Sequence, residues 1–392
     1  MTIEGSGKSY LTEISTRDVK FDAHKATSDE IARLYGLQTD DGFTGFAVGS
    51  RFISFDKFSL RINACGSWLK FVEVDGKLKL VDARFCKCPS CSMCQWRRSL
   101  KWRAKFLTLL PEIQKNYPSH KWVFLTLTIR NCGLDDLRPT LTHLNGAFNR
   151  LSKLKQFPMD GLVKSVEVTR AWDCYHKGKF LGRHGAKWID RWEYQHKQVL
   201  DLKPTDEVHP HLHICGLVPA SYFSTSYIRQ EQWVKMWQQC LRVDYSPVVN
   251  IKTVKPSKKP LPTPEEFVEN PELADESGMI QAICETLKYT VKEQDLIGSY
   301  CQDDNANSTW LKAITQHLYK TRKVEYRGIL KDIGKELEAV VNDDNLININ
   351  DESEPEGRPT EELEFRWNSA IKHYVFSRLI DRSKLLISNC TH

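Results

Sequence analysis

The chain has 392 residues, of which 41% are hydrophobic and 27% are charged, the balance of an ordinary soluble protein with a sizeable core. This composition excludes global disorder, a collagen-like repeat and a small disulfide scaffold. No stretch approaches the roughly 20 consecutive apolar residues that a membrane helix needs. The first residues lack the apolar core of a signal peptide, so we expect a cytoplasmic protein with no membrane partner.

Charge is distributed unevenly along the chain. The formal net charge is only +6. Residues 95–130, however, carry eight Lys/Arg against the single acid Glu112, and residues 341–364 carry nine Asp/Glu against the single base Arg358. A basic body with an acidic segment favours a polyanion-binding protein, although an uneven solvated surface explains the pattern equally well.

Hydrophobic patterning predicts alternating strands and helices after a polar start. Residues 57–94 read as short strands that end in a cysteine cluster. Apolar residues alternate at period two in three later strands, over residues 122–129, 162–169 and 209–218. Helices are predicted over residues 28–35, 95–110, 137–154, 230–240, 278–292, 308–319 and 360–379.

Two segments interrupt this pattern. A long polar and aromatic insertion covers residues 170–208, and a proline-rich loop covers residues 255–269. The order of elements predicts an α+β fold, with a central antiparallel sheet flanked by helices that cover one of its sides.

Histidines alternate in the third of these strands. His211 and His213 lie on one face because alternate strand residues share a face, and His209 has the same parity. Pro210 between them is typical of an edge or a strand start. Glu167 is the only acid of the strand at 162–169, which we expect to lie beside the histidines. Two imidazoles and a carboxylate form an open divalent-ion site, although exposed histidines without any ligand remain the alternative.

The helix predicted over 278–292 carries a second polar group. Its apolar residues form one stripe, and the opposite face presents Glu285, Tyr289 and Lys292. Glu285 and Tyr289 are four residues apart, so their side chains should be neighbours. A phenol, a carboxylate and an ammonium on one face suit nucleophilic chemistry, but an ordinary solvated face explains this helix equally well.

Four cysteines cluster within nine residues. Cys86, Cys88, Cys91 and Cys94 would be unusual as disulfides in a reducing compartment, so their spacing indicates a metal site. Reduced cysteines without a ligand are the alternative.

Three motifs in order resemble those of a known family. FLTLT (124–128), HPHLH (209–213) and ETLKY (285–289) look like motifs 1, 2 and 3 of single-tyrosine rolling-circle replication initiators of small plasmids, part of the HUH endonuclease superfamily. RINACGSWLKF (61–71) and FCKCPSCSMCQWRRSLKW (85–102) are similar to further segments of that family.

The resemblance implies a plasmid replication initiator that nicks and rejoins DNA. Its sheet would form a palm like those of RRM and ferredoxin-like folds. Tyr289 would attack the double-strand origin, leaving a 5′-phosphotyrosine and a 3′-OH primer, and Glu285 would activate water for termination. Mn²⁺ or Mg²⁺ would bind His211, His213 and Glu167, with His209 as a further candidate. The partners would be single-stranded or hairpin origin DNA and a host helicase.

The resemblance also implies a structural zinc ion on Cys65, Cys86, Cys91 and Cys94, with Cys88 as the alternative ligand. The zinc would fix the basic helix that follows. Positive side chains of this helix and of the tyrosine helix are the expected DNA contacts: Arg97, Arg98, Lys101, Arg103, Lys105, Lys288 and Lys292.

Four segments are expected: residues 1–56, partly flexible; 57–120, with the zinc site and basic helix; 121–338, the endonuclease domain; and 339–392, an acidic flexible segment with a last helix.

Other functions share parts of this pattern. A relaxase or transposase of the same superfamily would use the same metal and tyrosine. A histidine-triad nucleotide hydrolase would use the alternating histidines, and a non-enzymatic zinc regulator would use only the cysteines. Tyr300 is an alternative second nucleophile.

Overall fold

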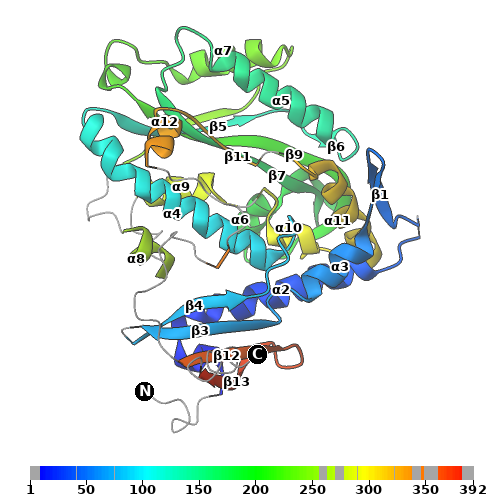
Figure 1. Cartoon of the computed structure of the whole chain (residues 1–392). Coiled ribbons are helices and arrows are strands. Elements are labelled where there is room, and N and C mark those ends of the chain that lie inside the picture. The colour runs from blue at the N-terminus through cyan, green and yellow to red at the C-terminus, as the bar shows by residue number, and fades with distance from the viewer. Residues whose placement is uncertain are drawn as a thin grey trace.

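The computed structural model describes residues 9–40, 42–74, 76–255, 263–269, 278–288, 290–321, 323–337, 346–347 and 361–381. Within these residues the largest element is an antiparallel sheet of seven strands, in the order β10-β5-β9-β7-β11, with β6 beside β9 and β8 beside β7 (Figure 1). Its strands are β5 (Lys121–Thr128), β6 (Cys132–Gly133), β7 (Gly161–His176), β8 (Lys179–Gly185), β9 (Asp201–Val218), β10 (Val249–Thr253) and β11 (Val324–Gly328).

Helices cover both faces of this sheet, so the expectation of helices on one side is wrong. Trp102 of α4 (Ser92–Asn116) stacks on Tyr326 of β11, with ring centroids 5.7 Å apart. On the other face, Lys164 of β7 donates to Asn145 of α5 (Leu137–Leu151) at 2.6 Å. Figure 1 shows α4, α9 (Gly278–Thr286) and α12 (Ile329–Glu336) on the first face and α5 and α7 (Gln230–Leu241) on the second. Because both faces are covered, residues 161–168 of β7 and 210–218 of β9 are buried at every position.

The histidine strand is longer than predicted. β9 begins at Asp201, so Pro210 lies inside a central strand and not at its start. β5 pairs with β9 from His211 onward, and β6 pairs with β9 at Val208 and Glu207. Pro210 falls between these two pairings, where a residue without an N–H breaks no ladder on that side.

A second sheet of four strands joins the two ends of the described chain, in the order β13-β12-β3-β4. Its strands are β3 (Trp68–Val74), β4 (Lys77–Ala83), β12 (Glu361–Asn368) and β13 (His373–Asp381). The helix predicted over 360–379 is therefore wrong. Leu363, Phe365 and Trp367 alternate at period two, which is the strand signal that the helical interpretation overlooked.

The remaining elements pack around these sheets. A small hairpin is formed by β1 (Gly45–Val48) and β2 (Arg51–Ser54). Helix α3 (Phe55–Asn63) occupies residues 57–63, where the sequence predicts short strands. The other helices are α1 (Leu11–Ile14), α2 (Val19–Gly36), α3 (Phe55–Asn63), α6 (Ala186–His196), α8 (Pro264–Glu269), α10 (Glu293–Ile297) and α11 (Asp304–Leu318). One contiguous hydrophobic core runs from Leu11 to Tyr374 and joins both sheets with their helices.

Candidate active site

Three buried polar side chains meet on the face of the large sheet that α4 and α9 cover. Glu167 of β7 lies directly opposite His211 of β9, and His213 follows on the same face. Oε2 of Glu167 is 3.0 Å from Nε2 of His211 and 2.7 Å from Nε2 of His213. Their ligand atoms are close enough together to hold one metal ion. The structure thus brings together the three residues that the sequence assigned to a divalent ion.

The hydrogen bonds of this group favour a cation at its centre. Nδ1 of His211 is 3.2 Å from the carbonyl oxygen of His209, and because a carbonyl only accepts, this nitrogen carries the proton. Nε2 of His211 faces the Glu167 carboxylate, so that a metal ion can lie between these two ligand atoms. Oε1 of Glu167 is buried without a hydrogen bond from the described residues. Both features fit a metal site.

Protonation in the group also suits a metal ion. Burial alone would raise the pKa of Glu167, but its contacts with His211 and His213 and the charge of Lys288 hold that pKa well below its usual range. Burial lowers the pKa of His213 despite the neighbouring carboxylate. An ionised carboxylate and neutral imidazoles are the forms that ligate metals.

His209 stands apart from this group. His209 pairs with Thr169 of β7, which lies two residues after Glu167 along that strand. Its Nδ1 is 2.7 Å from the side-chain oxygen of Asn131. Burial, followed by the charge of His211, lowers the pKa of His209 to about 4. The residue therefore lies outside the cluster and is held neutral.

Two lysines and a second carboxylate surround the group. Nζ of Lys288 is 2.6 Å from Oε2 of Glu167 and 2.6 Å from Oε1 of Glu285. Oε1 of Glu285 is 3.9 Å from Nε2 of His213, and Nζ of Lys292 is 3.9 Å from Oε1 of Glu167. Burial opposes ionisation of Glu285, but the charge of Lys288, its hydrogen bond and the nearby His213 together outweigh burial and lower the pKa of that carboxyl. Both lysines therefore face the carboxylates of the site.

The predicted nucleophile, Tyr289, lies outside the described residues. The helix expected over 278–292 is shorter than predicted, because α9 ends at Thr286. The N–H of Val168 donates to the carbonyl of Thr290 at 2.7 Å, and this bond to the edge of β7 draws the chain away from a helical path. The prediction of one continuous helix over residues 278–292 is therefore wrong at its C-terminal end.

Helix α4 and helix α2 hold both sides of this segment. The hydroxyl of Ser99 donates to the carbonyl of Leu287 at 2.9 Å. Further along, the hydroxyl of Ser92 donates to Glu293 at 2.6 Å, and Nδ1 of His24 is 2.9 Å from the same carboxylate oxygen. Sequence reasoning missed this second junction, because its members are 68 and 201 residues apart and carry no local motif.

Four cysteines converge at the start of α4. The Sγ atoms of Cys65, Cys86, Cys91 and Cys94 lie within 4.8 Å of one another. The Sγ of Cys94 is 3.5 Å from that of Cys65 and 3.7 Å from that of Cys86, close to the ~3.8 Å that four sulfurs ~2.3 Å from one zinc ion would show. Cys88 lies outside this group. The geometry therefore favours the ligand set that includes Cys65.

Backbone and side-chain donors support charge on these sulfurs. The N–H of Lys87 points at Cys94 from 3.2 Å and that of Cys86 at Cys65 from 3.3 Å. Burial opposes ionisation of Cys91, but the neighbouring thiols and Ser28 lower its pKa well below the usual value. The same contacts raise the pKa of Cys65, Cys86 and Cys94, because one negative charge among four close thiols disfavours a second. A divalent ion at their centre would supply the positive charge that lets all four ionise, as zinc binding requires.

The basic helix does not present the expected row of cations to solvent. Arg97 and Lys101 are buried, and Arg97 donates to the backbone carbonyls of Leu346 and Ile347. Burial lowers the pKa of Arg97 to about 9. The prediction that Arg97 and Lys101 contact phosphates is therefore wrong, because α4 is enclosed by the sheet and other helices. The other three predicted contacts of this helix are partly buried: Arg98, Arg103 and Lys105.

Tyr300, the alternative nucleophile, is engaged elsewhere. Its hydroxyl donates to Asp190 of α6, and its ring packs against Trp172 at 5.7 Å between centroids. Burial and then Asp190 raise the pKa of Tyr300, which makes the phenol a poorer nucleophile.

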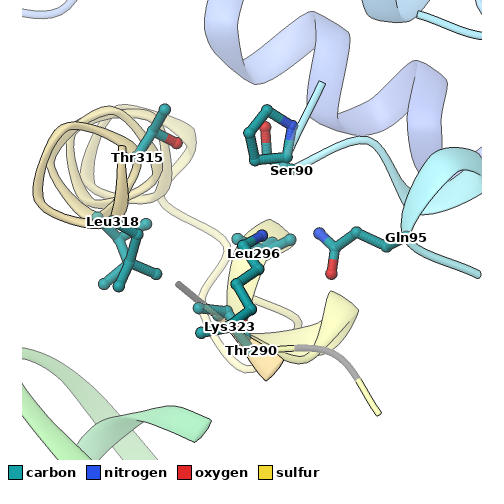
Figure 2. A pocket seen from close by; sticks show the side chains of 10 residues that line it. Ser90, Gln95, Thr290, Leu296, Thr315, Leu318 and Lys323 are labelled. Atoms are coloured by element: carbon teal, nitrogen blue, oxygen red, sulfur yellow. The ribbon is translucent and has the colours of Figure 1, made fainter. Parts of the chain in front are cut away.

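A small cavity lies behind the segment that follows residue 289. Figure 2 shows Thr290 and Leu296 facing Gln95 on one side and Thr315 and Leu318 on the other. Its volume of about 30 Å³ has room for water but not for a nucleotide. The cavity therefore adds no substrate site.

Comparison with known proteins places the chain in a family. A family model described as "Replication protein" matches residues 77–375. A protein from Streptococcus pneumoniae named "Protein rep" is 31% identical over 322 residues, covering 80% of this chain and 82% of that protein. A "Protein rep" from Bacillus amyloliquefaciens is 29% identical and covers 82% and 85%. A "Replication protein" from Staphylococcus aureus is 24% identical and covers 68% and 94%.

No solved structure matches the chain. Among the described residues no helix is both long and apolar enough to cross a membrane. The match of the family model over most of the sequence, together with relatives of similar length, shows that the chain belongs to the Rep_1 family of replication proteins.

Proposed function

We propose that this protein initiates rolling-circle replication of a plasmid by nicking one strand of the origin and joining itself to the cut end. The observation that carries this proposal is the group of Glu167, His211 and His213, with Glu285 and Lys288 directly beside it. Lys288 immediately precedes Tyr289 in the sequence, and Glu285 lies four residues before it. The names of the relatives support a role in replication.

The metal group fits a divalent ion by its donors. Two imidazoles and one carboxylate leave positions open for phosphate oxygens and water, and the imidazoles favour Mn²⁺ over Mg²⁺. Bound there, the ion would polarise the scissile phosphate. Lys288 and Lys292 would hold further positive charge where the pentavalent phosphate develops negative charge.

The chemical step assigned to Tyr289 is a transesterification. Its phenol oxygen attacks the phosphorus, the bond from phosphorus to the 3′ oxygen breaks, and the phenol proton is lost while the 3′ oxygen gains one. The products are a 5′-phosphotyrosine and a 3′-OH primer. A free phenol has a pKa of about 10, so its ionisation at pH 7 costs about 4 kcal/mol, which the positive charges of the site would offset in large part.

Glu285 is suited to the termination step. Its side chain is 37% exposed and its pKa is lowered, so at neutral pH it is a carboxylate that water can reach. We assign to Glu285 the activation of the water that cleaves the regenerated origin, so that termination needs no second tyrosine nucleophile.

The four-cysteine group fits a structural zinc ion, since all four positions are protein thiols and none is left for a substrate. Cys91 and Cys94 lie at the start of α4, so the ion would fix the N-terminal end of this helix. Ser99 of the same helix donates to the carbonyl of Leu287, just before Tyr289 in the sequence. In this proposal the zinc supports the nucleophile segment instead of presenting α4 to DNA.

Supercoiled plasmid carrying this gene tests the proposal. We expect the full-length protein with Mn²⁺ to convert it to nicked circles, and EDTA to prevent this. Tyr289→Phe should abolish nicking while DNA binding survives, and Tyr300→Phe should nick as the natural protein does. Nicking by Tyr289→Phe at the natural rate would contradict the assignment.

A further inference from the structure

The insertion between the second and third predicted strands forms a separately packed arm. We define the arm as residues 171–205, which comprise the outer parts of β7 and β9 with β8 and α6. It has its own small core, made by Trp172, Cys174, Ile189 and Leu200, apart from the main core. Tyr300 fastens it to the loop after α10 through Asp190. Figure 1 shows α6 near α10, below the large sheet in that view. The arm is thus a separately packed extension of the two strands that carry the candidate active site.

The arm carries cations that its own acids do not neutralise. The arm contains seven Lys/Arg against four acids: Asp173, Asp190, Glu193 and Asp201. Three of these acids are occupied within the fold, Asp173 by Arg183, Asp190 by the hydroxyl of Tyr300 and Glu193 by the N–H of Leu200. Among the described residues no carboxylate forms an ion pair with five exposed members of this set: Lys177, Lys179, Lys187, Arg191 and Lys197. This surface therefore has an uncompensated positive charge.

Aromatic rings are exposed among these cations. Tyr194 is 74% exposed and Phe180 is 52% exposed, both high values for such side chains. Nζ of Lys197 lies 4.0 Å from the centre of the Tyr194 ring. On α6, Lys187 and Arg191 precede Tyr194 by seven and three residues, so the three share one helix face. Exposed rings beside cations are the features that bind single-stranded nucleic acid.

The same two strands connect the arm with the candidate active site. Glu167 lies opposite His211 at one point of the β7–β9 ladder, and Tyr175 lies opposite Asp201 at the other. Eight residues separate these points on β7, which is about 26 Å at about 3.3 Å per residue. A nucleic acid strand rises about 3.4 Å per nucleotide when stacked, so about eight nucleotides span this distance.

We propose that the arm binds single-stranded DNA that extends from the active site, with phosphates on Lys187 and Arg191 and bases stacked on Tyr194 and Phe180. This inference rests on the proposed function for the identity of the DNA. Single-stranded DNA is favoured over duplex because the exposed rings need unpaired bases to stack on. The arm would retain the strand while its neighbouring phosphate is cut.

Fluorescence anisotropy with labelled oligonucleotides tests the arm. We would compare the full-length protein with a variant carrying Phe180→Ser, Lys187→Ser, Arg191→Ser and Tyr194→Ser, all at exposed positions. The probes are dT20, which is long enough to reach from the site past the far end of the arm, dT6, which is too short to reach that far end, and a 20-base-pair duplex. A matched control is Tyr227→Ser with Lys235→Ser, an exposed ring and an exposed cation away from the arm.

We expect the four-residue variant to bind dT20 at least about ten-fold more weakly, because one stacked base alone contributes about that factor. The loss for dT6 should be smaller, because this oligonucleotide reaches no farther than the near end of the arm. The control variant should bind dT20 as the natural protein does. Each phosphate contact contributes about 0.7 to the slope of log affinity against log salt for single strands. Removing only Lys187 and Arg191 should therefore reduce the magnitude of this slope by about 1.4.

Three outcomes would overturn the arm proposal: unchanged dT20 binding, an equal loss for dT6, or a loss confined to the duplex. Failure of the wild-type protein to nick plasmid would instead refute the proposed function, while the difference between dT20 and dT6 would still measure the arm.

Discussion

Replacing Asp295 with asparagine should make the free energy of unfolding less dependent on pH. Asp295 lies in the first turn of α10 and is fully buried. Its Oδ2 accepts the N–H of Arg170 at 3.4 Å, while Oδ1 has no hydrogen-bond partner among the described residues. Burial outweighs that N–H and the charge of Lys292, and raises the pKa of Asp295 from 3.8 to about 7.

The sign and size of the effect follow from this pKa. Between pH 4 and pH 7 the folded chain holds a proton on Asp295 that the unfolded chain has released, so this carboxyl makes the protein less stable as the pH rises. At about 1.36 kcal/mol per pKa unit, the destabilisation reaches about 4 kcal/mol above pH 7, of which about 1.7 kcal/mol is already present at pH 5. About 2–3 kcal/mol should therefore develop between pH 5 and pH 8.

Urea unfolding followed by tryptophan fluorescence at pH 5, 6, 7 and 8 measures this difference. Asp295→Asn should gain about 2–3 kcal/mol relative to the natural protein between the extremes. Its new amide N–H₂ has no acceptor in place of Oδ1, which costs a constant amount at every pH and leaves the trend intact. Asp304→Asn is the control, because Arg33 lowers the pKa of that exposed carboxyl and keeps it ionised throughout. Parallel curves for Asp295→Asn and the natural protein would refute the reasoning.

Three further predictions concern the metal groups and the second carboxylate. Glu167→Gln should reduce nicking about a hundred-fold or more with little change in DNA affinity, as measured by plasmid conversion and anisotropy, and undiminished nicking would remove this residue from the site. Cys94→Ser should lose the bound zinc and much of the stability, whereas Cys88→Ser should retain one zinc per chain by elemental analysis, and the reverse result would exchange their roles. Glu285→Gln should still form the covalent adduct but fail to release it by hydrolysis, which a chase with unlabelled DNA would reveal, and normal release would assign the water to another group.

The central strands and the metal group follow from periodicity. Alternating apolar residues placed β5, β7 and β9, and the parity of His211 and His213 required one shared face. The alternation of period two could not separate His209 from His211 and His213, because all three share one face. The strand register decides which histidine lies opposite Glu167, and register depends on contacts between strands.

The remaining differences come from tertiary contacts. The spacing of Arg97 and Lys101 suggested an exposed basic helix, but α4 is covered by neighbours that sequence periodicity cannot locate. The bond from Val168 to Thr290 ends a helix whose local sequence would continue it. At the other end of the chain, β12 finds its pairing partner in β3, almost three hundred residues earlier. Such partners lie far outside any local window.

Covalent capture tests the central claim most directly. The full-length protein would be incubated with labelled single-stranded DNA and Mn²⁺, denatured in detergent, digested, and the labelled peptide sequenced by mass spectrometry. We predict a phosphodiester bond on Tyr289, absent in Tyr289→Phe and after EDTA treatment. An adduct on Tyr300, or nicked plasmid without any protein-bound DNA, would contradict the account.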